Sequence, residues 1–229
     1  MVIKYYFDLM SQPCRALYIF LKLTNIPFEA CPVALRKGEH LTEEFKKKFS
    51  KFQRVPFIHD GNFRLTESVA IFRYLAREYP VKDNWYSKDS KQQAKIDEYL
   101  EWQHLNIRGN CTLYFRTKFL QPALTGEQPD LKTVKFLENN MINALDKFQE
   151  LFISDNPFVN GQTISFADIL AACEIEQPRM AGYDPKENRP KLKEWIERVR
   201  NECNPYYDEA HVFVNKMVEK NKQTVQANL

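Results

Sequence analysis

The segment 8-DLMSQPCRALYIFLK-22 contains a sharp change of pattern near the start of the chain. The residues before it, Val2 to Asp8, form a short apolar run typical of a strand, and Pro13 to Lys22 repeat apolar side chains at helical spacing. Asp8 to Gln12 are therefore predicted to form a strand-to-helix turn. Ser11 lies in this turn, two positions before a proline, where a serine most often caps the helix.

Strand and helix patterns continue to alternate as far as about residue 85. The order of predicted elements is βαβαββα, which indicates a small α/β domain. After the first strand and helix, the predicted segments are extended Phe28–Val33, helical Thr42–Phe49, extended Phe57–His59, extended Phe63–Leu65 and helical Glu67–Tyr79.

The rest of the chain shows only helical spacing after the polar stretch 77-REYPVKDNWYSKDS-90. We therefore expect an α/β domain over residues 1–81, a linker over 82–87 and an all-helical domain over 88–229. Within the second domain, 163-TISFADILAACEI-175 is apolar nearly all round, so this helix should lie at the centre. Ser165 and Asp168 have the spacing of a capping box at its start. The tail 221-NKQTVQANL-229 is predicted to be too polar to pack firmly.

Composition excludes several classes of protein. With 229 residues, 44% hydrophobic and 28% charged, the chain can bury a large core, and disorder is not expected. No apolar run approaches the roughly 20 residues that span a bilayer, and the start lacks the pattern of a secretory signal, so we expect a cytoplasmic protein without membrane contact.

Cysteines and charges exclude further classes. The five cysteines are scattered and include no C-x-x-C pair, which argues against both a disulfide framework and a metal site. The formal net charge is only +3, and the basic cluster Lys46–Lys48 fits a solvated helix face better than a nucleic-acid site.

Three features give Ser11 a further interpretation beside the cap. The amino terminus of a helix carries unpaired amides and positive potential, which stabilise an anion. Cys14 follows at the spacing of a redox C-x-x-C motif in which Ser11 replaces the exposed cysteine. The Val55–Pro56 pair precedes a strand pair, where a cis proline could present the Val55 backbone to an extended peptide.

These residues together resemble the cytosolic glutathione transferases, most closely the theta class. The resemblance rests on S-Q-P-C-R-A, K-G-E-H, V-P, L-T-E-S-V-A-I and I-S-F-A-D-I, and it covers essentially the whole chain. It implies a thioredoxin-like amino-terminal domain, an all-helical second domain, and an enzyme that conjugates glutathione to small electrophiles in detoxification. Glutathione would be the co-substrate, and no metal is implied. The alternative is a non-catalytic module of the same fold that binds glutathione or another ligand.

The resemblance also implies roles for individual residues. Ser11 would be catalytic and activate the glutathione thiol. The residues implied to bind glutathione are His40 and Leu41, with Arg54, beside the glycine end, Val55 beside the cysteinyl unit, and Glu67 and Ser68 at the γ-glutamyl end.

A second group of candidates lies near the electrophile or the partner subunit. In some theta-like chains a polar residue of the long helix reaches glutathione across the dimer, and Leu105 aligns there, which leaves His104, Asn106 and Arg108 as substitutes. We expect a homodimer that joins the Glu67–Tyr79 helix to the Gln92–Phe119 region, with Phe72, Tyr74, Tyr114 and Phe115 as apolar contacts. Met10, Tyr114 and Phe115 could instead line an electrophile pocket, or simply pack in the core.

Overall fold

The computed structural model describes residues 2–227, with side chains as far as residue 221. A four-stranded mixed sheet forms the amino-terminal part, in the order β2-β1-β3-β4. Strand β1 pairs in parallel with β2 and antiparallel with β3, and β3 pairs antiparallel with β4. The strands are β1 (Ile3–Phe7), β2 (Phe28–Pro32), β3 (Phe57–Asp60) and β4 (Phe63–Thr66). The predicted βαβαββα order and thioredoxin-like fold are confirmed.

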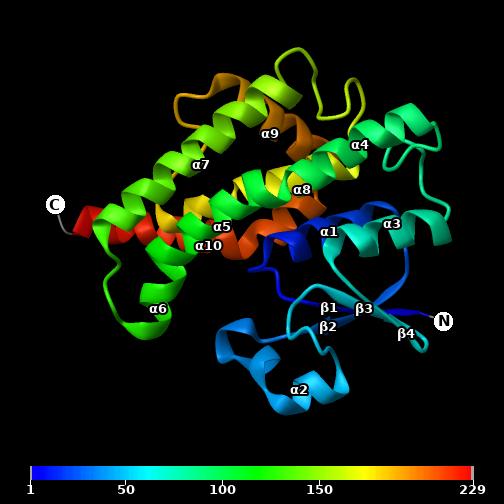
Figure 1. Ribbon diagram of the computed structural model, residues 1–229, viewed down its shortest axis with the longest axis horizontal. Helices are drawn as coiled ribbons and strands as arrows, with labels where there is room; N and C mark the ends of the chain where they lie inside the picture. Colours follow the sequence, from blue (N-terminus) through cyan, green and yellow to red (C-terminus); the bar gives the residue numbers. More distant parts are fainter. Residues whose placement is uncertain (1, 228–229) are drawn as a thin grey trace.

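Helices cover both faces of this sheet. The helices α1 (Gln12–Leu23) and α3 (Ser68–Glu78) lie between the sheet and the helical domain, and α2 (Glu43–Lys48) lies on the opposite face (Figure 1). Two short 3₁₀ turns, η1 (Leu35–Lys37) and η2 (Glu39–Leu41), lead into α2. The lysines of α2 are exposed, and two of them pair with glutamates of its first turn, as a solvated helix face requires.

The second part of the chain is helical throughout, as predicted. Its elements are α4 (Ser90–Trp102), α5 (Gly109–Phe115), α6 (Gln121–Thr125), α7 (Leu131–Phe152), α8 (Phe166–Ile175), the 3₁₀ turn η5 (Gln177–Ala181), α9 (Pro190–Cys203) and α10 (Tyr206–Ala227). Two π-helical segments, η3 (His104–Arg108) and η4 (Arg116–Leu120), interrupt the long region from α4 to α6. No helix within residues 2–227 has the length and apolar character needed to cross a membrane.

Helix α8 lies at the centre of the molecule. Every residue from Phe166 to Ile175 is buried, which confirms the interpretation of its all-round apolar sequence. The predicted capping box is present, because Asp168 accepts a hydrogen bond from the Ser165 amide at 2.9 Å and the Ser165 side chain bonds the first turn in return. The helix packs along α1, and the two together fix the sheet against the helical domain.

Phe72 takes part in this central packing. Its ring stacks on Phe166 with centroids 3.8 Å apart and is fully buried. The expectation that Phe72 supplies an exposed contact for dimerisation is therefore wrong, because the same side chain cannot both fill the core and face a partner.

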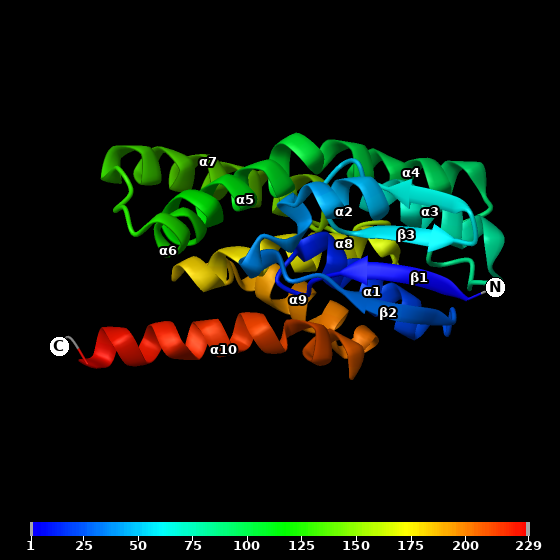
Figure 2. The same cartoon turned by 90° about the horizontal axis from the view of Figure 1, so that it is seen from below.

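The carboxyl-terminal helix extends into the tail that was predicted to be too polar to pack firmly. Helix α10 continues to Ala227, and in Figure 2 it extends along one side of the helical domain toward the carboxyl terminus. The first residue of the predicted unpacked tail, Asn221, donates a hydrogen bond to the Met180 carbonyl at 2.8 Å. Residues 228–229 of that tail lie outside the described residues.

Candidate active site

Ser11 occupies the N-cap position of α1 without capping the helix. Its backbone is extended, with φ −81° and ψ 127°, and its hydroxyl makes no bond to the amides of the first turn. The turn is held instead by Asp8, whose carbonyl accepts from the Ser11 amide at 2.9 Å and whose carboxylate accepts from the Met10 amide at 2.9 Å. The half-buried Ser11 hydroxyl is thereby left for another partner at the positive end of a helix.

Arg15 fixes this turn against the helical domain. Its guanidinium donates to the Leu9 and Met10 carbonyls at 3.0 and 3.1 Å, and also to the Cys173 carbonyl at 2.8 Å and to Gln177 at 2.7 Å. The side chain has no exposed surface. No role for Arg15 was predicted, although a cation at a buried position of an apolar helix face indicates a specific set of acceptors.

Cys14 lies on the buried face of α1. Burial raises the pKa of its thiol to about 12, although contact with the Ser11 hydroxyl lowers that pKa in part. The thiol is therefore protonated near neutral pH and is a poor nucleophile. The other four cysteines are also free, and three of them are buried.

A cleft of about 130 Å³ lies at the amino-terminal ends of α1 and α3. Its lining residues are Pro13, Phe52, Arg54, Val55, Pro56, Thr66, Glu67, Ser68 and Arg108. The cleft thus brings together four of the predicted glutathione-binding residues with one residue of the helical domain. The Val55–Pro56 peptide bond is cis. Among the lining residues, Phe52, which is 51% exposed, and Thr66 were not singled out from the sequence.

Glu67 and Ser68 mark the start of α3. Glu67 has φ 69° and ψ 115°, a conformation that is strained for a residue with a side chain and that shifts the helix start from Glu67 to Ser68. Such outliers persist mainly at functional sites, where the surrounding structure enforces them. The exposed Glu67 carboxylate and the buried Ser68 hydroxyl therefore lie side by side on one wall of the cleft.

His40 and Leu41 lie on η2 rather than in the cleft lining. The Gln53 side chain donates to the His40 carbonyl at 3.2 Å, which joins η2 to the segment that leads to Val55. Burial lowers the pKa of the half-buried His40. Leu41 is 64% exposed.

His104, Asn106 and Arg108 were the candidates for reaching glutathione bound to the partner subunit. Of these three, only Arg108 lines the cleft. It donates to the Ser68 hydroxyl at 3.1 Å and to the Glu174 carboxylate at 2.7 Å, both within the same chain. Burial and the nearby Arg108 lower the pKa of His104, and the Asn106 amide donates to the Trp102 carbonyl at 2.8 Å.

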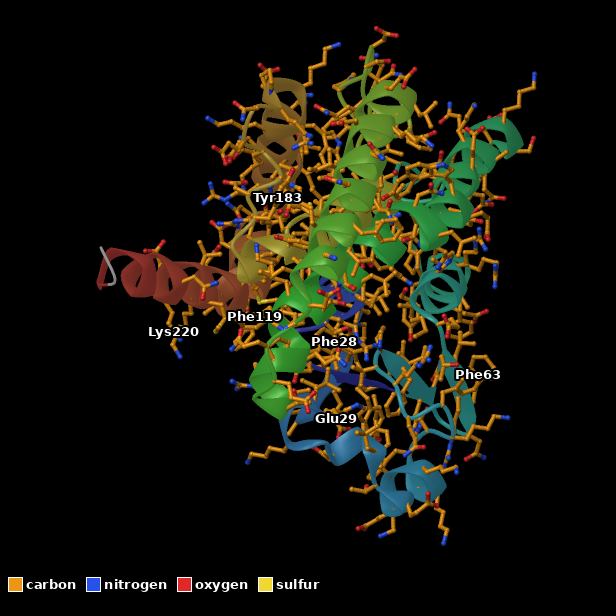
Figure 3. All side chains as sticks on the ribbon, turned by 60° about the vertical axis from the view of Figure 1, so that its left-hand side comes forward. Phe28, Glu29, Phe63, Phe119, Tyr183 and Lys220 are labelled. Carbon is orange, nitrogen blue, oxygen red and sulfur yellow. The ribbon has the colours of Figure 1, made fainter. Side chains whose placement is uncertain are left out.

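The three candidates for an electrophile pocket differ in exposure. Met10 is half-buried beside Ser11, whereas Tyr114 and Phe115 are 0% and 4% exposed. Tyr114 packs against Tyr183 and Phe115 against Phe119, and Figure 3 labels both neighbours. Of the two interpretations left open by the sequence, these contacts favour core packing for the two aromatic residues, which also cannot provide exposed dimer contacts.

Comparison with known proteins places this geometry in a family. The family model described as "Glutathione S-transferase, N-terminal domain" matches residues 1–77, and "Glutathione S-transferase, C-terminal domain" matches residues 111–202. The chain belongs to the glutathione S-transferase family. It is 42% identical over 219 residues to glutathione S-transferase theta-1 of Bos taurus, which covers 94% of this chain and 90% of that protein.

Solved theta-class transferases have the same structure. Human glutathione-S-transferase T1-1 in its apo form is 39% identical, with a TM-score of 0.90, over 95% of this chain and 91% of that one. A human theta-class transferase in complex with the glutathione conjugate of 1-menaphthyl sulfate is 35% identical, with a TM-score of 0.90, over 98% of this chain and 92% of that one. The expected fold and enzyme class are therefore confirmed. Among the described residues, no group of three or more His, Cys, Asp or Glu side chains could hold a metal ion.

Proposed function

We propose that this transferase ionises the thiol of glutathione through the Ser11 hydroxyl and adds the resulting thiolate to an electrophilic carbon of a small molecule. The observation that carries the proposal is the uncapped Ser11 hydroxyl at the amino terminus of α1, two residues before the cleft-lining Pro13. A serine that capped its own helix would have its oxygen held toward the first-turn amides, whereas the uncapped Ser11 side chain can turn toward a ligand sulfur.

The energy required is within reach of such a site. A free thiol has a pKa of about 8.5, so only a few per cent is ionised near neutral pH. Lowering that pKa by ~2 units requires about 2.7 kcal/mol. One charge-assisted hydrogen bond from Ser11, together with the positive end of α1, supplies a stabilisation of that size. Ser11 acts here as a donor to sulfur and not as a base.

The cleft has the charges that glutathione requires. The exposed Glu67 carboxylate can accept from the γ-glutamyl amine, while the Ser68 hydroxyl and the first amides of α3 bind the neighbouring carboxylate. The Val55 backbone would pair with the cysteinyl unit. Arg54, His40 and Leu41 would surround the glycine end. The proposal therefore uses glutathione as co-substrate and no metal.

We further propose a cytoplasmic homodimer that acts in detoxification, without nucleic-acid or membrane partners. The exposed Leu105 and Leu113, at 87% and 51%, provide apolar surface in the Gln92–Phe119 region in place of the buried aromatic residues. Sedimentation at micromolar concentration should show a dimer, and a monomer would refute this assembly.

The decisive experiment replaces Ser11 by alanine. Ser11→Ala should raise the apparent pKa of bound glutathione, which the ultraviolet absorbance of the thiolate reports, and lower turnover about 10²-fold or more. Glutathione affinity should stay nearly unchanged, because the lost bond matters mainly to the anion. Cys14→Ala is the matched control and should retain activity at a small cost in stability.

The result also separates a transferase from a disulfide-exchange enzyme and from a binding module. Full activity in Ser11→Ala combined with inactive Cys14→Ala would show that thiol exchange at Cys14 is the reaction. A panel of alkyl halides, epoxides, organic hydroperoxides and aryl halides tests the second alternative. Glutathione binding without turnover of any of them would identify a non-catalytic module, which the 42% identity to a curated transferase disfavours.

A further inference from the structure

A hydrogen bond between the two domains lies directly beside Ser11. Gln12, the first residue of α1, donates from its side-chain Nε2 to the hydroxyl of Thr112 on α5 at 3.1 Å. Gln12 is buried, whereas Thr112 is half-buried and so within reach of a ligand. Because Gln12 follows Ser11 in the chain, this bond brings Thr112 close to the serine turn.

The Thr112 hydroxyl has a proton to donate. A hydroxyl donates one hydrogen bond and accepts two, and the bond from Gln12 uses an acceptor site only. Two other threonines, Thr24 and Thr125, donate to the carbonyl four residues earlier in their helices, at 2.7 and 3.1 Å. Thr112 makes no such bond to the Arg108 carbonyl, and no other acceptor for its proton is found in the described part of the chain. This donor is therefore available to a ligand.

The position of Arg108 indicates that the same face of α5 borders the cleft. Arg108 immediately precedes α5 and lines the cleft. Thr112 comes four residues later, so the two side chains lie one turn apart on one face of the helix. Two separate contacts support this placement, since Arg108 donates to Ser68 and Thr112 accepts from Gln12. Both contacts cross from the helical domain to the α/β domain.

We infer that the Thr112 hydroxyl donates a hydrogen bond to the atom that leaves the electrophilic carbon, and that Gln12 positions this hydroxyl. The inference rests on the proposed transferase function, in which the glutathione sulfur lies at Ser11. In a direct displacement the leaving atom lies on the side of the carbon opposite the attacking sulfur. Ser11 belongs to the α/β domain and Thr112 faces it from the helical domain, so Thr112 is on the side where the leaving atom is expected.

The contribution of this donor depends on the leaving atom. With an epoxide, the S–C bond forms while a C–O bond breaks, and the electron pair stays on oxygen as an alkoxide that then takes a proton from water. A hydrogen-bond donor placed where this charge develops lowers the barrier. With an alkyl iodide, the electron pair leaves with iodide, a weakly basic anion that needs little stabilisation. Thr112 should therefore favour epoxides among the electrophiles.

The test compares the turnover of an epoxide and of an alkyl iodide of similar size at saturating glutathione. Thr112→Val keeps the shape of the side chain but removes the hydroxyl, so kcat for the epoxide should fall about 10- to 100-fold while kcat for the iodide changes less than about 3-fold. Thr112→Ser keeps the hydroxyl and should retain most of the epoxide activity. The pKa of the bound glutathione thiol should stay unchanged in both variants, because Ser11 is intact.

Gln12→Leu tests the positioning role. Without the amide, the Thr112 hydroxyl can rotate and donate to the Arg108 carbonyl, so the ratio of epoxide to iodide turnover should fall about 3- to 10-fold. A merely structural role of Gln12 would lower both rates and leave their ratio unchanged. If Gln12→Leu fails to fold, Gln12→Glu gives the same test, since its carboxylate would accept the Thr112 proton and remove the donor from the ligand.

Thr125→Val is the matched control. Thr125 is exposed on α6, and its hydroxyl donates to the Gln121 carbonyl of its own helix. This variant should leave the ratio of epoxide to iodide turnover unchanged. Circular dichroism would verify the fold of each variant.

The outcomes separate this inference from the proposed function. If wild type turns over neither electrophile with glutathione, the proposed function is wrong. If wild type accepts the iodide but not the epoxide, or if Thr112→Val lowers both rates equally, changes neither or lowers the iodide rate more, the inference alone is wrong. If wild type accepts only the epoxide, a loss in Thr112→Val that Thr112→Ser restores supports the inference, and an equal loss or no loss in the two variants overturns it.

Discussion

The two ends of α8 each hold a fully buried carboxylate, but the surroundings of these carboxylates differ. At the amino end, Asp168 accepts from the Val159 amide at 2.7 Å, the Ser165 amide at 2.9 Å and the Trp195 indole at 3.0 Å, and it also bonds the Ser165 hydroxyl. Near the carboxyl end, Glu174 accepts one hydrogen bond, from Arg108, and its Oε2 has no partner within the part of the chain that the structure describes.

This difference separates a carboxylate with several partners from one whose second oxygen has no partner among the described residues. The hydrogen bonds of Asp168 all lie inside the helical domain. Its carboxylate therefore serves to hold the start of α8 in place. Glu174 instead faces an arginine that continues into the cleft. The comparison predicts that changes around Asp168 alter stability, whereas changes around Glu174 alter glutathione recognition.

The largest expected effect on stability is at Asp168. Asp168→Ala removes four hydrogen bonds and leaves buried donors without an acceptor, so the free energy of unfolding should fall by about 4 kcal/mol. Urea denaturation measures this change, and the KM for glutathione of the remaining folded protein should not change. A fall below ~1 kcal/mol, or a raised KM, would break the comparison.

Phe115, a candidate for the electrophile pocket, is also expected to affect stability rather than recognition. Because its ring is buried against Phe119, Phe115→Ala should lower the free energy of unfolding by about 3 kcal/mol and leave the ranking of electrophiles unchanged. Urea denaturation measures the free energy of unfolding, and assays with a panel of electrophiles measure the ranking. A changed ranking with little loss of stability would place Phe115 in the electrophile pocket instead.

His211 should make a smaller contribution to stability, and this contribution depends on pH. It is buried against Tyr207 and near Arg15, Glu176 and Arg179; burial and the charge of Arg15 lower its pKa from 6.5 to about 3. The unfolded chain therefore binds a proton at His211 that the folded chain excludes. Above pH 6.5 His211 is neutral in both states and the folded protein keeps its full stability. As the pH falls from 6.5 toward 3, the unfolded chain gains the proton and the free energy of unfolding decreases.

Between pH 6.5 and pH 5, His211 should lower the free energy of unfolding by about 1.5 kcal/mol. Denaturation at a series of pH values measures it, and His211→Asn, which does not titrate there, is the control. Equal slopes for wild type and His211→Asn would show that His211 does not contribute to the acid sensitivity.

The sequence predicted the fold well because its signals are local. Alternation and helical spacing identified the element order, and the all-round apolar character of residues 163–175 identified the central helix. Ser11 was singled out because it lies at the start of a helix, where residue type and position reveal the turn, whereas Glu67 and Ser68 were assigned through the family resemblance. Glu174 was missed, although a charged side chain within that apolar helix was a usable sign of a buried partner.

By itself, the sequence determined the two kinds of domain, the serine at the first turn and the family resemblance, since each depends on residues close together in the chain. Only the tertiary structure decided that Arg108 lies beside Ser68, 40 residues away, and Glu174, 66 residues away. Periodicity assigns a side chain to a face of its helix but does not identify what packs on that face. The π-helical turn before Gly109 also changes which face Arg108 occupies, and helical spacing alone does not reveal such a turn.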